Sequence, residues 1–146
     1  GQPVVGIDFV ELPIMEAKRK AAELGVDGEF LQMDVLKLPS LDRQFDSVID
    51  CGLFHVLSDA DRRAYVAALT HVTKLSGKLF LMCFSDQEPV GPGPRRIRQD
   101  EIRAAFAEGW TVESITATHF EPNPQSKETF VDGGPRAWFA VIRRES

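Results

Sequence analysis

The chain of 146 residues has the size of one domain, and its hydrophobic content of 43% can supply a buried core. A formal net charge of −5 gives no general electrostatic attraction to nucleic acid or to an anionic membrane surface. No apolar run reaches the roughly 20 residues of a transmembrane helix and no signal peptide is evident. We therefore expect a cytoplasmic protein whose partners include neither nucleic acid nor a membrane.

The predicted elements alternate between strands and helices along most of the chain. Pro13 suits the first position of a helix that Gly25 ends, and Ser58 with Asp61 resembles a capping box. The apolar run at 78–84 is typical of a central strand covered on both faces. In chain order we expect strand 3–8, helix 13–24, strand 29–33, strand 45–50, a helix from 58 to about 76, strand 78–84, helix 100–108, strand 110–120 and strand 136–143.

This order of elements predicts an α/β fold. Strands that alternate with helices favour a mostly parallel, Rossmann-like sheet with helices on both faces. No helix separates the last two strands, so they are expected to form an antiparallel pair joined by the polar loop 121–135. The Pro/Gly-rich segment 86–94 is expected to lack regular structure.

Each predicted parallel strand ends near an acidic residue: Asp8, Asp34, Asp50 and, after Ser85, Asp86. In an open α/β sheet, ligands bind outside the carboxyl ends of the strands. Carboxylates accept hydrogen bonds from sugar hydroxyls and exocyclic amines, whereas phosphates bind helix N-termini or basic groups. An Asp at a strand end also has a purely structural use, because its side chain binds nearby backbone N–H groups. The pattern favours a nucleoside over a triphosphate.

Two segments resemble the class I S-adenosylmethionine-dependent methyltransferases: FDSVIDCGLFHVL at 45–57 and PRRIRQDEIRAAFAEGWTVESI at 94–115. The chain resembles this family from the family's second strand to its C-terminus. Within the family it is similar to the small-molecule methyltransferases of the thiopurine, thiol/halide and tellurite-resistance type. The stretch VVGID at 4–8 is less specific, because nicotinamide enzymes share it.

The resemblance implies S-adenosylmethionine as the cofactor and a small-molecule methyl acceptor with a thiol, halide, hydroxyl or amine. It implies the following cofactor contacts: Asp8 with the ribose hydroxyls, Phe9 with the adenine face, Asp34 with the adenine amine, the N–H of Val35 with a ring nitrogen, and the backbone of Asp50 and Cys51 with the methionine end. It places Phe54, His55, Ser85 and the 86–97 loop on the acceptor side.

The chemistry implied by this family needs little help from side chains. A sulfonium methyl group is already electrophilic, so positioning supplies most of the catalysis. His55 is the candidate base for a thiol or hydroxyl acceptor, but it can equally pack or hydrogen-bond at the start of the next helix. The basic run of Arg95, Arg96 and Arg98 is either a solvated helix start or a landing point for an anionic acceptor.

The number and spacing of the cysteines do not indicate a metal site. Cys51, His55 and Cys83 offer too few ligands at too wide a spacing. We interpret both cysteines as reduced thiols that pack in a cytosolic protein, and Cys51 as a neutral thiol rather than a reactive one.

The family's first strand and its glycine-rich loop have no counterpart before the strand at 3–8. The family's strand order is 3-2-1-4-5-7-6, so that strand would lie between the strands expected at 3–8 and 45–50. We expect residues 1–146 to be a single methyltransferase-like domain that is N-terminally incomplete, through truncation or incomplete recording. Direct pairing of the flanking strands, or exchange with a second copy, would be alternatives, and self-association across the gap is expected of the chain alone.

Two other functions remain open. A non-catalytic Rossmann-like binding or assembly module that has lost the glycine-rich loop would keep the same fold. A nicotinamide-dependent dehydrogenase would also use an acid after VVGID. Asp34 in QMD, the segment DCGLFH and the antiparallel C-terminal pair count against the dehydrogenase.

Overall fold

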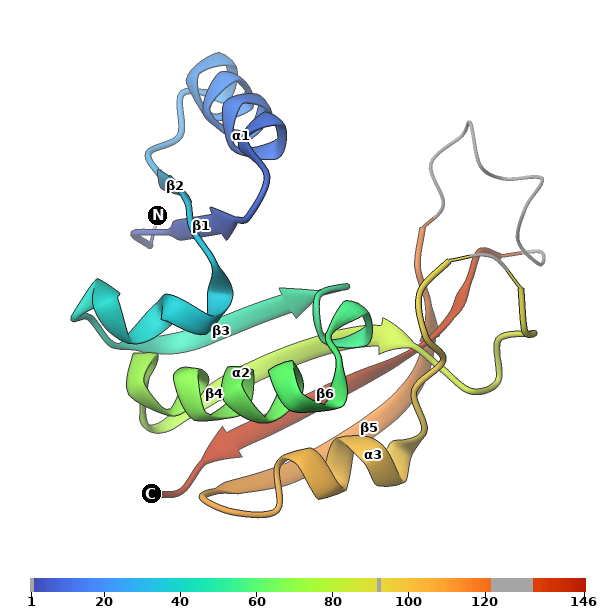
Figure 1. The fold of residues 1–146 in the computed structure, drawn as a ribbon. Coiled ribbons are helices and arrows are strands. Elements are labelled where there is room, and N and C mark those ends of the chain that lie inside the picture. Colours follow the sequence, from blue (N-terminus) through green and yellow to red (C-terminus); the bar gives the residue numbers. More distant parts are fainter. Residues whose placement is uncertain (1, 92, 122–132) are drawn as a thin grey trace.

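The computed structural model of the protein describes residues 2–91, 93–121 and 133–146, and most of the predicted loop 121–135 lies outside these ranges. The elements in chain order are β1 (Val5–Asp8), α1 (Glu11–Leu24), β2 (Glu29–Gln32), η1 (Val35–Leu41), β3 (Phe45–Cys51), η2 (Phe54–Val56), α2 (Asp59–Val72), β4 (Thr73–Phe84), α3 (Gln99–Ala105), β5 (Trp110–His119) and β6 (Arg136–Arg144). Figure 1 shows their arrangement.

The strands form two separate sheets. β1 and β2 make a parallel pair, and the other strands make a four-stranded sheet in the order β3-β4-β6-β5. β3 and β4 are parallel, whereas β6 is antiparallel to both of its neighbours. The predicted α/β fold with an antiparallel C-terminal pair is therefore confirmed.

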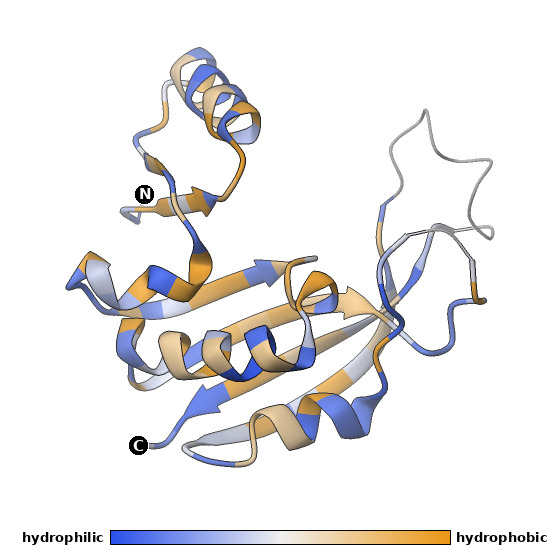
Figure 2. Cartoon of the chain, viewed as in Figure 1, coloured by the Kyte–Doolittle hydropathy of each residue, from blue (hydrophilic) through white to orange (hydrophobic). Residues whose placement is uncertain are grey.

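The core of the larger unit lies between its sheet and the helices α2 and α3, which cover the same face of that sheet (Figure 1). Tyr65, Leu69 and Val72 belong to the buried side of α2, at the spacing of one helix face. Ser58 caps α2, because its Oγ accepts a hydrogen bond from the N–H of Asp61 at 3.1 Å. Alternating hydrophobic residues run along the strands beneath these helices (Figure 2).

The predicted boundary between α2 and β4 near residue 76 is wrong. Thr73 already pairs with Phe45, and the register shifts before Ser47 pairs with Lys78. Ser76 has a φ of 62°, and a Cβ on Gly77 would lie 2.8 Å from the carbonyl oxygen of Lys74. The strand therefore has an irregularity at Ser76 and Gly77, where the sequence suggested a helix end.

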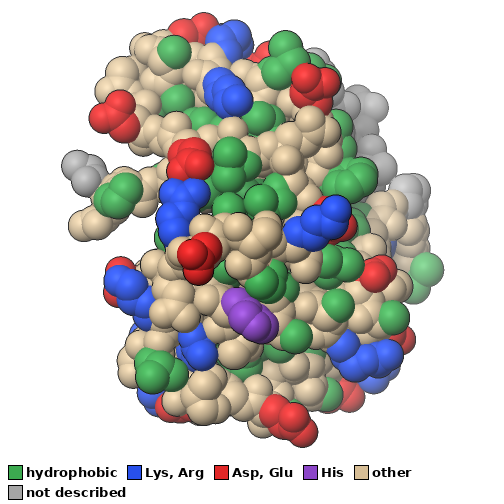
Figure 3. Space-filling view, turned by 60° about the vertical axis from the view of Figure 1, so that its left-hand side comes forward, with side chains coloured by type: hydrophobic (Ala, Val, Ile, Leu, Met, Phe, Trp, Pro, Cys, Tyr) green, Lys and Arg blue, Asp and Glu red, His purple; other side chains and the backbone are tan. Residues whose placement is uncertain are grey.

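An open gap separates the two sheets. β1 and β3 are each at the edge of their sheet, and a cavity of about 880 Å³ lies between them and reaches down to η1 and α2. Its deep part is apolar, with walls that include Val5, Ile7, Leu38, Val48 and Leu69. In the space-filling view, hydrophobic side chains are visible between the upper and lower parts of the molecule (Figure 3).

The first testable prediction concerns the small sheet. We expect the backbone amides of Ile7 and Leu31 to exchange with deuterium at least about tenfold faster than those of Leu81 and Ala140. β1 and β2 pair only with each other among the described residues, whereas β4 and β6 each pair on both sides, and an isolated two-stranded pair is marginally stable. Hydrogen exchange read by NMR measures these rates. Equal protection in both sheets would contradict the prediction.

Candidate functional site

The cavity between the sheets collects every residue that the sequence predicted to hold a cofactor. One end of it lies at the carboxyl ends of β1, β2 and β3. The predicted cofactor residues on its lining are Asp8, Phe9, Asp34, Val35, Asp50 and Cys51. The cavity therefore has an apolar floor between the strand bodies and an acidic mouth at the strand ends.

Asp8 stands at the end of β1 with one oxygen already used. Its Oδ1 accepts a hydrogen bond from the N–H of Val10 at 2.8 Å, which fixes the turn into α1. Within the described residues, its other carboxylate oxygen has no hydrogen-bond partner. The ring of Phe9 is 71% exposed beside it, and the amide of Gln32 donates to the Phe9 carbonyl at 3.2 Å.

Asp34 repeats this arrangement at the end of the neighbouring strand. It is the N-cap of η1, and its Oδ1 accepts from the N–H of Leu36 at 2.9 Å. Its second oxygen likewise has no partner in the part of the chain that the structure describes. The N–H of Met33 donates to the Asp8 carbonyl at 2.9 Å, so the two strand ends are joined and both carboxylates border the same cavity.

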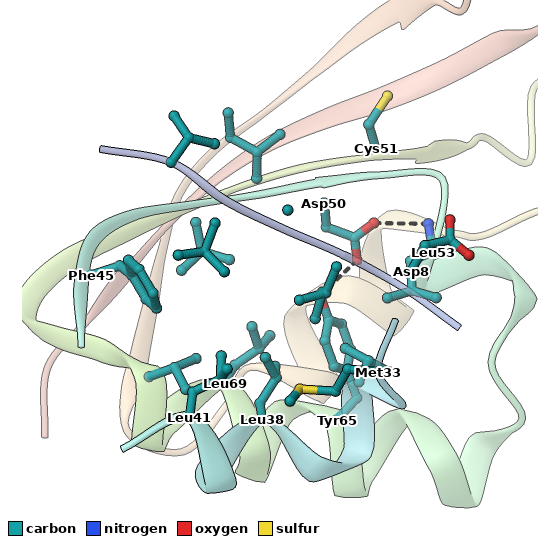
Figure 4. A pocket seen from close by; sticks show the side chains of 18 of the residues that line it. Asp8, Met33, Leu38, Leu41, Phe45, Asp50, Cys51, Leu53, Tyr65 and Leu69 are labelled. Carbon is teal, nitrogen blue, oxygen red and sulfur yellow. Dashed lines mark hydrogen bonds between the residues drawn. The ribbon is translucent and has the colours of Figure 1, made fainter. Parts of the chain in front are cut away.

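Asp50 differs from the other two acids because its side chain is only 3% exposed. Oδ1 accepts from the N–H groups of Leu53 at 2.8 Å and Phe54 at 3.4 Å, and the hydroxyl of Tyr65 donates to Oδ2 at 3.1 Å. Burial raises the pKa of Asp50 and raises that of Tyr65 well above its ordinary value. Figure 4 shows the carboxylate turned toward Tyr65 while the thiol of Cys51 points away from the cavity.

The sequence analysis did not identify Tyr65 as a site residue. The residue belongs to the core, at 2% exposed, but it also lines the cavity. A buried tyrosine hydroxyl usually has a hydrogen-bond partner, so a tyrosine on the buried face of a helix indicates a polar group nearby.

Among the described residues that were predicted on the acceptor side, none lines this cavity. Phe54 is fully buried, stacks on Phe106 with ring centroids 6.0 Å apart, and lies 4.4 Å from the guanidinium carbon of Arg62. Ser85 is also fully buried, and its Oγ accepts from the N–H of Gln87 at 3.2 Å. Packing and loop hydrogen bonds enclose both side chains in this structure, and the acceptor-side role of Phe54 and Ser85 stays a prediction.

His55 is buried against β4 rather than open to the cavity. It is 6% exposed, and its Nδ1 accepts a hydrogen bond from the N–H of Phe84 at 2.9 Å. The rings of Phe84 and Phe120 pack around it at centroid distances of 5.0 and 6.0 Å. Burial, together with the positive charge of Arg96, lowers the pKa of His55 to about 4. At neutral pH the ring is neutral, and the nitrogen that could accept a proton is already occupied.

The basic run after the Pro/Gly loop is built into the fold. Arg95 pairs with Asp59 at 2.6 Å and with Glu101, so it joins the starts of α2 and α3. Arg96 donates to the carbonyls of Pro89 and Pro94. These contacts favour the structural alternative over a landing point for an anionic acceptor.

Neither cysteine forms a disulfide. Burial raises the pKa of the Cys83 thiol to about 12, so that thiol is unreactive near neutral pH. Among residues 2–91, 93–121 and 133–146, no cluster of His, Cys, Asp and Glu side chains suits a metal ion, and no helix is long and apolar enough to cross a membrane.

A family model described as a methyltransferase domain matches residues 1–77. The match covers more than half of the chain, and the chain belongs to this family. The predicted membership of the class I S-adenosylmethionine-dependent methyltransferases is thereby confirmed, and S-adenosylmethionine is the cofactor of that class.

The alignments with curated relatives cover part of the length of each relative. The 2-heptyl-1-hydroxyquinolin-4(1H)-one methyltransferase of Mycobacteroides abscessus is 29% identical over 150 aligned residues, which cover 100% of this chain and 64% of the relative. The uncharacterized methyltransferase C750.03c of Schizosaccharomyces pombe is 36% identical over 86 residues, which cover 59% of each protein. The chain thus spans about 60% of the length of these relatives.

Solved structures match the fold along nearly the whole chain. One is described as "Conversion of a Disulfide Bond into a Thioacetal Group during Echinomycin Biosynthesis", with a TM-score of 0.83, 29% identity and coverage of 99% of this chain and 67% of that one. The magnesium protoporphyrin IX methyltransferase of Synechocystis PCC 6803 with bound SAM has a TM-score of 0.71, 19% identity and coverage of 99% and 61%. The similarity to the Synechocystis protein shows that the two proteins share a fold.

The buried state of His55 generates a prediction for stability against pH. Its pKa is lower in the folded chain, about 4, than the ordinary 6.5, so the unfolded chain binds the proton more readily. The stabilisation is present above pH 6.5 and is lost as the pH falls toward 4, by up to about 3 kcal/mol. We expect His55→Asn, which keeps an acceptor for the Phe84 N–H, to lack this part of the pH dependence.

Urea unfolding between pH 7 and 4.5 measures the free energy of unfolding of the parent and of the variant. The contribution of the carboxylates is common to both proteins and cancels in the difference between them. His119→Asn, at an exposed position on β5, is the matched control and should behave as the parent. If the parent and His55→Asn lose stability equally over this range, His55 is not buried as described.

Proposed function

We propose that the protein, in its natural full length, transfers a methyl group from S-adenosylmethionine to a small-molecule acceptor. The observation that carries this proposal is that all the predicted cofactor residues, from three strand ends, line one cavity. Family membership supports the reaction class. The lining chemistry supports the nucleoside, because carboxylates accept from hydroxyls and amines.

The residues at the cavity mouth fit the nucleoside half of the cofactor. The second oxygen of Asp8 is available for ribose hydroxyls, and that of Asp34 for the adenine amine. The exposed ring of Phe9 offers an apolar face for the base. The N–H of Val35 is at the first position of η1, where it has no intrahelical acceptor. When bound, the cofactor supplies an electrophilic methyl group.

The acceptor in this proposal is a small molecule whose nucleophile loses its proton readily or carries none. His55 is neutral with Nδ1 occupied, so orientation rather than strong base catalysis is the role left to the described residues. Among thiols, halides, hydroxyls and amines, a hydroxyl on an aromatic heterocycle is favoured by the name of the Mycobacteroides abscessus relative, a hydroxyquinolone methyltransferase.

A non-catalytic binding or assembly module is the second candidate. The observation in its favour is the gap itself, since the described residues leave β1 and β3 at the edges of separate sheets. This candidate shares the fold and the cavity but requires no cofactor binding. Failure of the full-length protein to bind S-adenosylmethionine would favour it.

We further propose that a β-strand from the protein's own chain outside residues 1–146 lies between β1 and β3, parallel to both. The apolar part of the cavity, away from the strand ends, suits the side chains of a strand. The edges of β1 and β3 that face each other across the cavity offer backbone groups to pair with it. The greater length of the matched relatives supports a segment of the same chain as the occupant. A second copy of the chain is the competing occupant.

The ribose contact is tested by Asp8→Ala. We expect the variant to bind S-adenosylmethionine more weakly by about 1.5–3 kcal/mol, the range for losing hydrogen bonds to a charged group. Isothermal titration calorimetry on the full-length protein measures this loss. Asp27→Ala removes an exposed carboxylate outside the cavity and serves as the control. Equal affinity of Asp8→Ala and the parent would rule out the ribose assignment.

The acceptor class is tested by a product screen. We expect transfer of the methyl group from labelled S-adenosylmethionine to one or more small hydroxylated heteroaromatics, thiols, halides or amines, detected by mass spectrometry. Nucleic acid and protein substrates are included as competing classes. Methylation of a macromolecule without any active small acceptor would overturn the proposal.

The strand proposal predicts different behaviour for residues 1–146 expressed alone and for the full-length protein. We expect the shorter chain to bind S-adenosylmethionine more weakly and to self-associate, because its strand edges and apolar walls remain uncovered. Light scattering and calorimetry measure both properties. A monomer of residues 1–146 with full-length affinity would show that no further strand is needed.

A further inference from the structure

The side chain of Asp50 has no task in the proposed cofactor contacts, which use only backbone at this position. It is nevertheless a buried carboxylate that lines the cofactor cavity, at 3% exposed. Removing a carboxylate from water is unfavourable unless hydrogen bonds compensate. Here the donors are the N–H groups of Leu53 and Phe54 and the hydroxyl of Tyr65.

These hydrogen bonds connect the end of β3 to two separate parts of the chain. The bonds from Leu53 and Phe54 close the turn that follows β3. The bond from Tyr65 attaches the same carboxylate to α2, 15 positions further along the chain. The carboxylate thus fixes the distance between the turn and the helix.

The turn is also attached to β4. Gly52, with a φ of 93°, donates its N–H to the carbonyl of Met82 at 2.9 Å, and His55 accepts from the N–H of Phe84. Asp50 is therefore the third attachment, and it acts from the cavity side. Leu53 and Gly52 both line the cavity, so any shift of the turn moves the wall of the site.

We propose that Asp50 and Tyr65 are a positioning pair that holds the turn after β3 against the methionine end of the cofactor. This inference rests on the proposed methyltransferase function. The pair does not touch the reacting atoms. It keeps the backbone of Asp50 and Cys51 at one position, so that the methyl group stays in line with the acceptor during the displacement.

The decisive variant is Tyr65→Phe in the full-length protein, which removes the hydroxyl and leaves the ring in the core. We expect kcat to fall about tenfold or more while KM for S-adenosylmethionine changes less than threefold, because the nucleoside contacts remain. Ile102→Val, a buried position on α3 outside the cavity, is the control for lost stability. It should lower Tm by a similar few degrees with kcat unchanged. A normal kcat in Tyr65→Phe would overturn the proposal.

A double-mutant cycle tests whether the residues act as one unit. If they do, Asp50→Asn with Tyr65→Phe should lower kcat no further than the more damaging single variant. Independent residues would instead multiply their effects, and that result would contradict the pairing.

One readout does not depend on catalysis. We expect the amides of Leu53 and Phe54 to exchange at least about tenfold faster in Tyr65→Phe than in the parent, because their shared acceptor is no longer held. Unchanged exchange overturns the positioning pair even if the enzyme is active. Faster exchange in a protein that methylates nothing supports the pair and counts against the proposed function alone.

Discussion

Backbone hydrogen bonding at strand edges is the constraint on which the rest of this structure depends. A strand inside a sheet needs partners on both sides, and buried N–H and C=O groups without partners are costly. Among the described residues, β1 pairs only with β2, and β3 only with β4. The chain therefore forms two units, and the contacts between them include η1, the packing of Ile7 against the larger core, and the ion pair of Arg43 with Glu29 at 2.7 Å. The cavity between the sheets is the space that this division leaves.

Three aspartates at neighbouring strand ends have different chemical states because their surroundings differ. Asp8 and Asp34 each use one oxygen for a backbone N–H two residues ahead, and both residues line the cavity. Asp50 is enclosed, with both oxygens engaged. The first arrangement suits recognition of hydroxyls and amines, and the second suits fixing of the backbone. In the proposed function, the same residue type recognises a ligand at two strand ends, and it shapes the cavity wall at the third.

The sequence predicted features that depend on local pattern or on strand direction. The parallel strands, the cap at Ser58 and the gathering of Asp8, Asp34 and Asp50 at one cavity follow from such rules. The direction of the side chains after β3 does not follow from such rules. The burial of Phe54 and His55 depends on contacts with Phe106 at the end of α3 and with β4, which are distant in sequence. The end of α2 was also misplaced, since pairing of Thr73 with Phe45 overrides the local signal of Ser76 and Gly77. The bond between Tyr65 and Asp50 required knowledge of how α2 packs.

The division into two units has an optical consequence. The chain contains two tryptophans and one tyrosine, and Trp110, Trp138 and Tyr65 all belong to the larger unit. Both indoles are 5% exposed, so their emission reports on the four-stranded sheet. The segment that carries β1, α1 and β2 has phenylalanine as its aromatic residue type. Melting of that segment would be nearly invisible to intrinsic fluorescence, although calorimetry would register its heat.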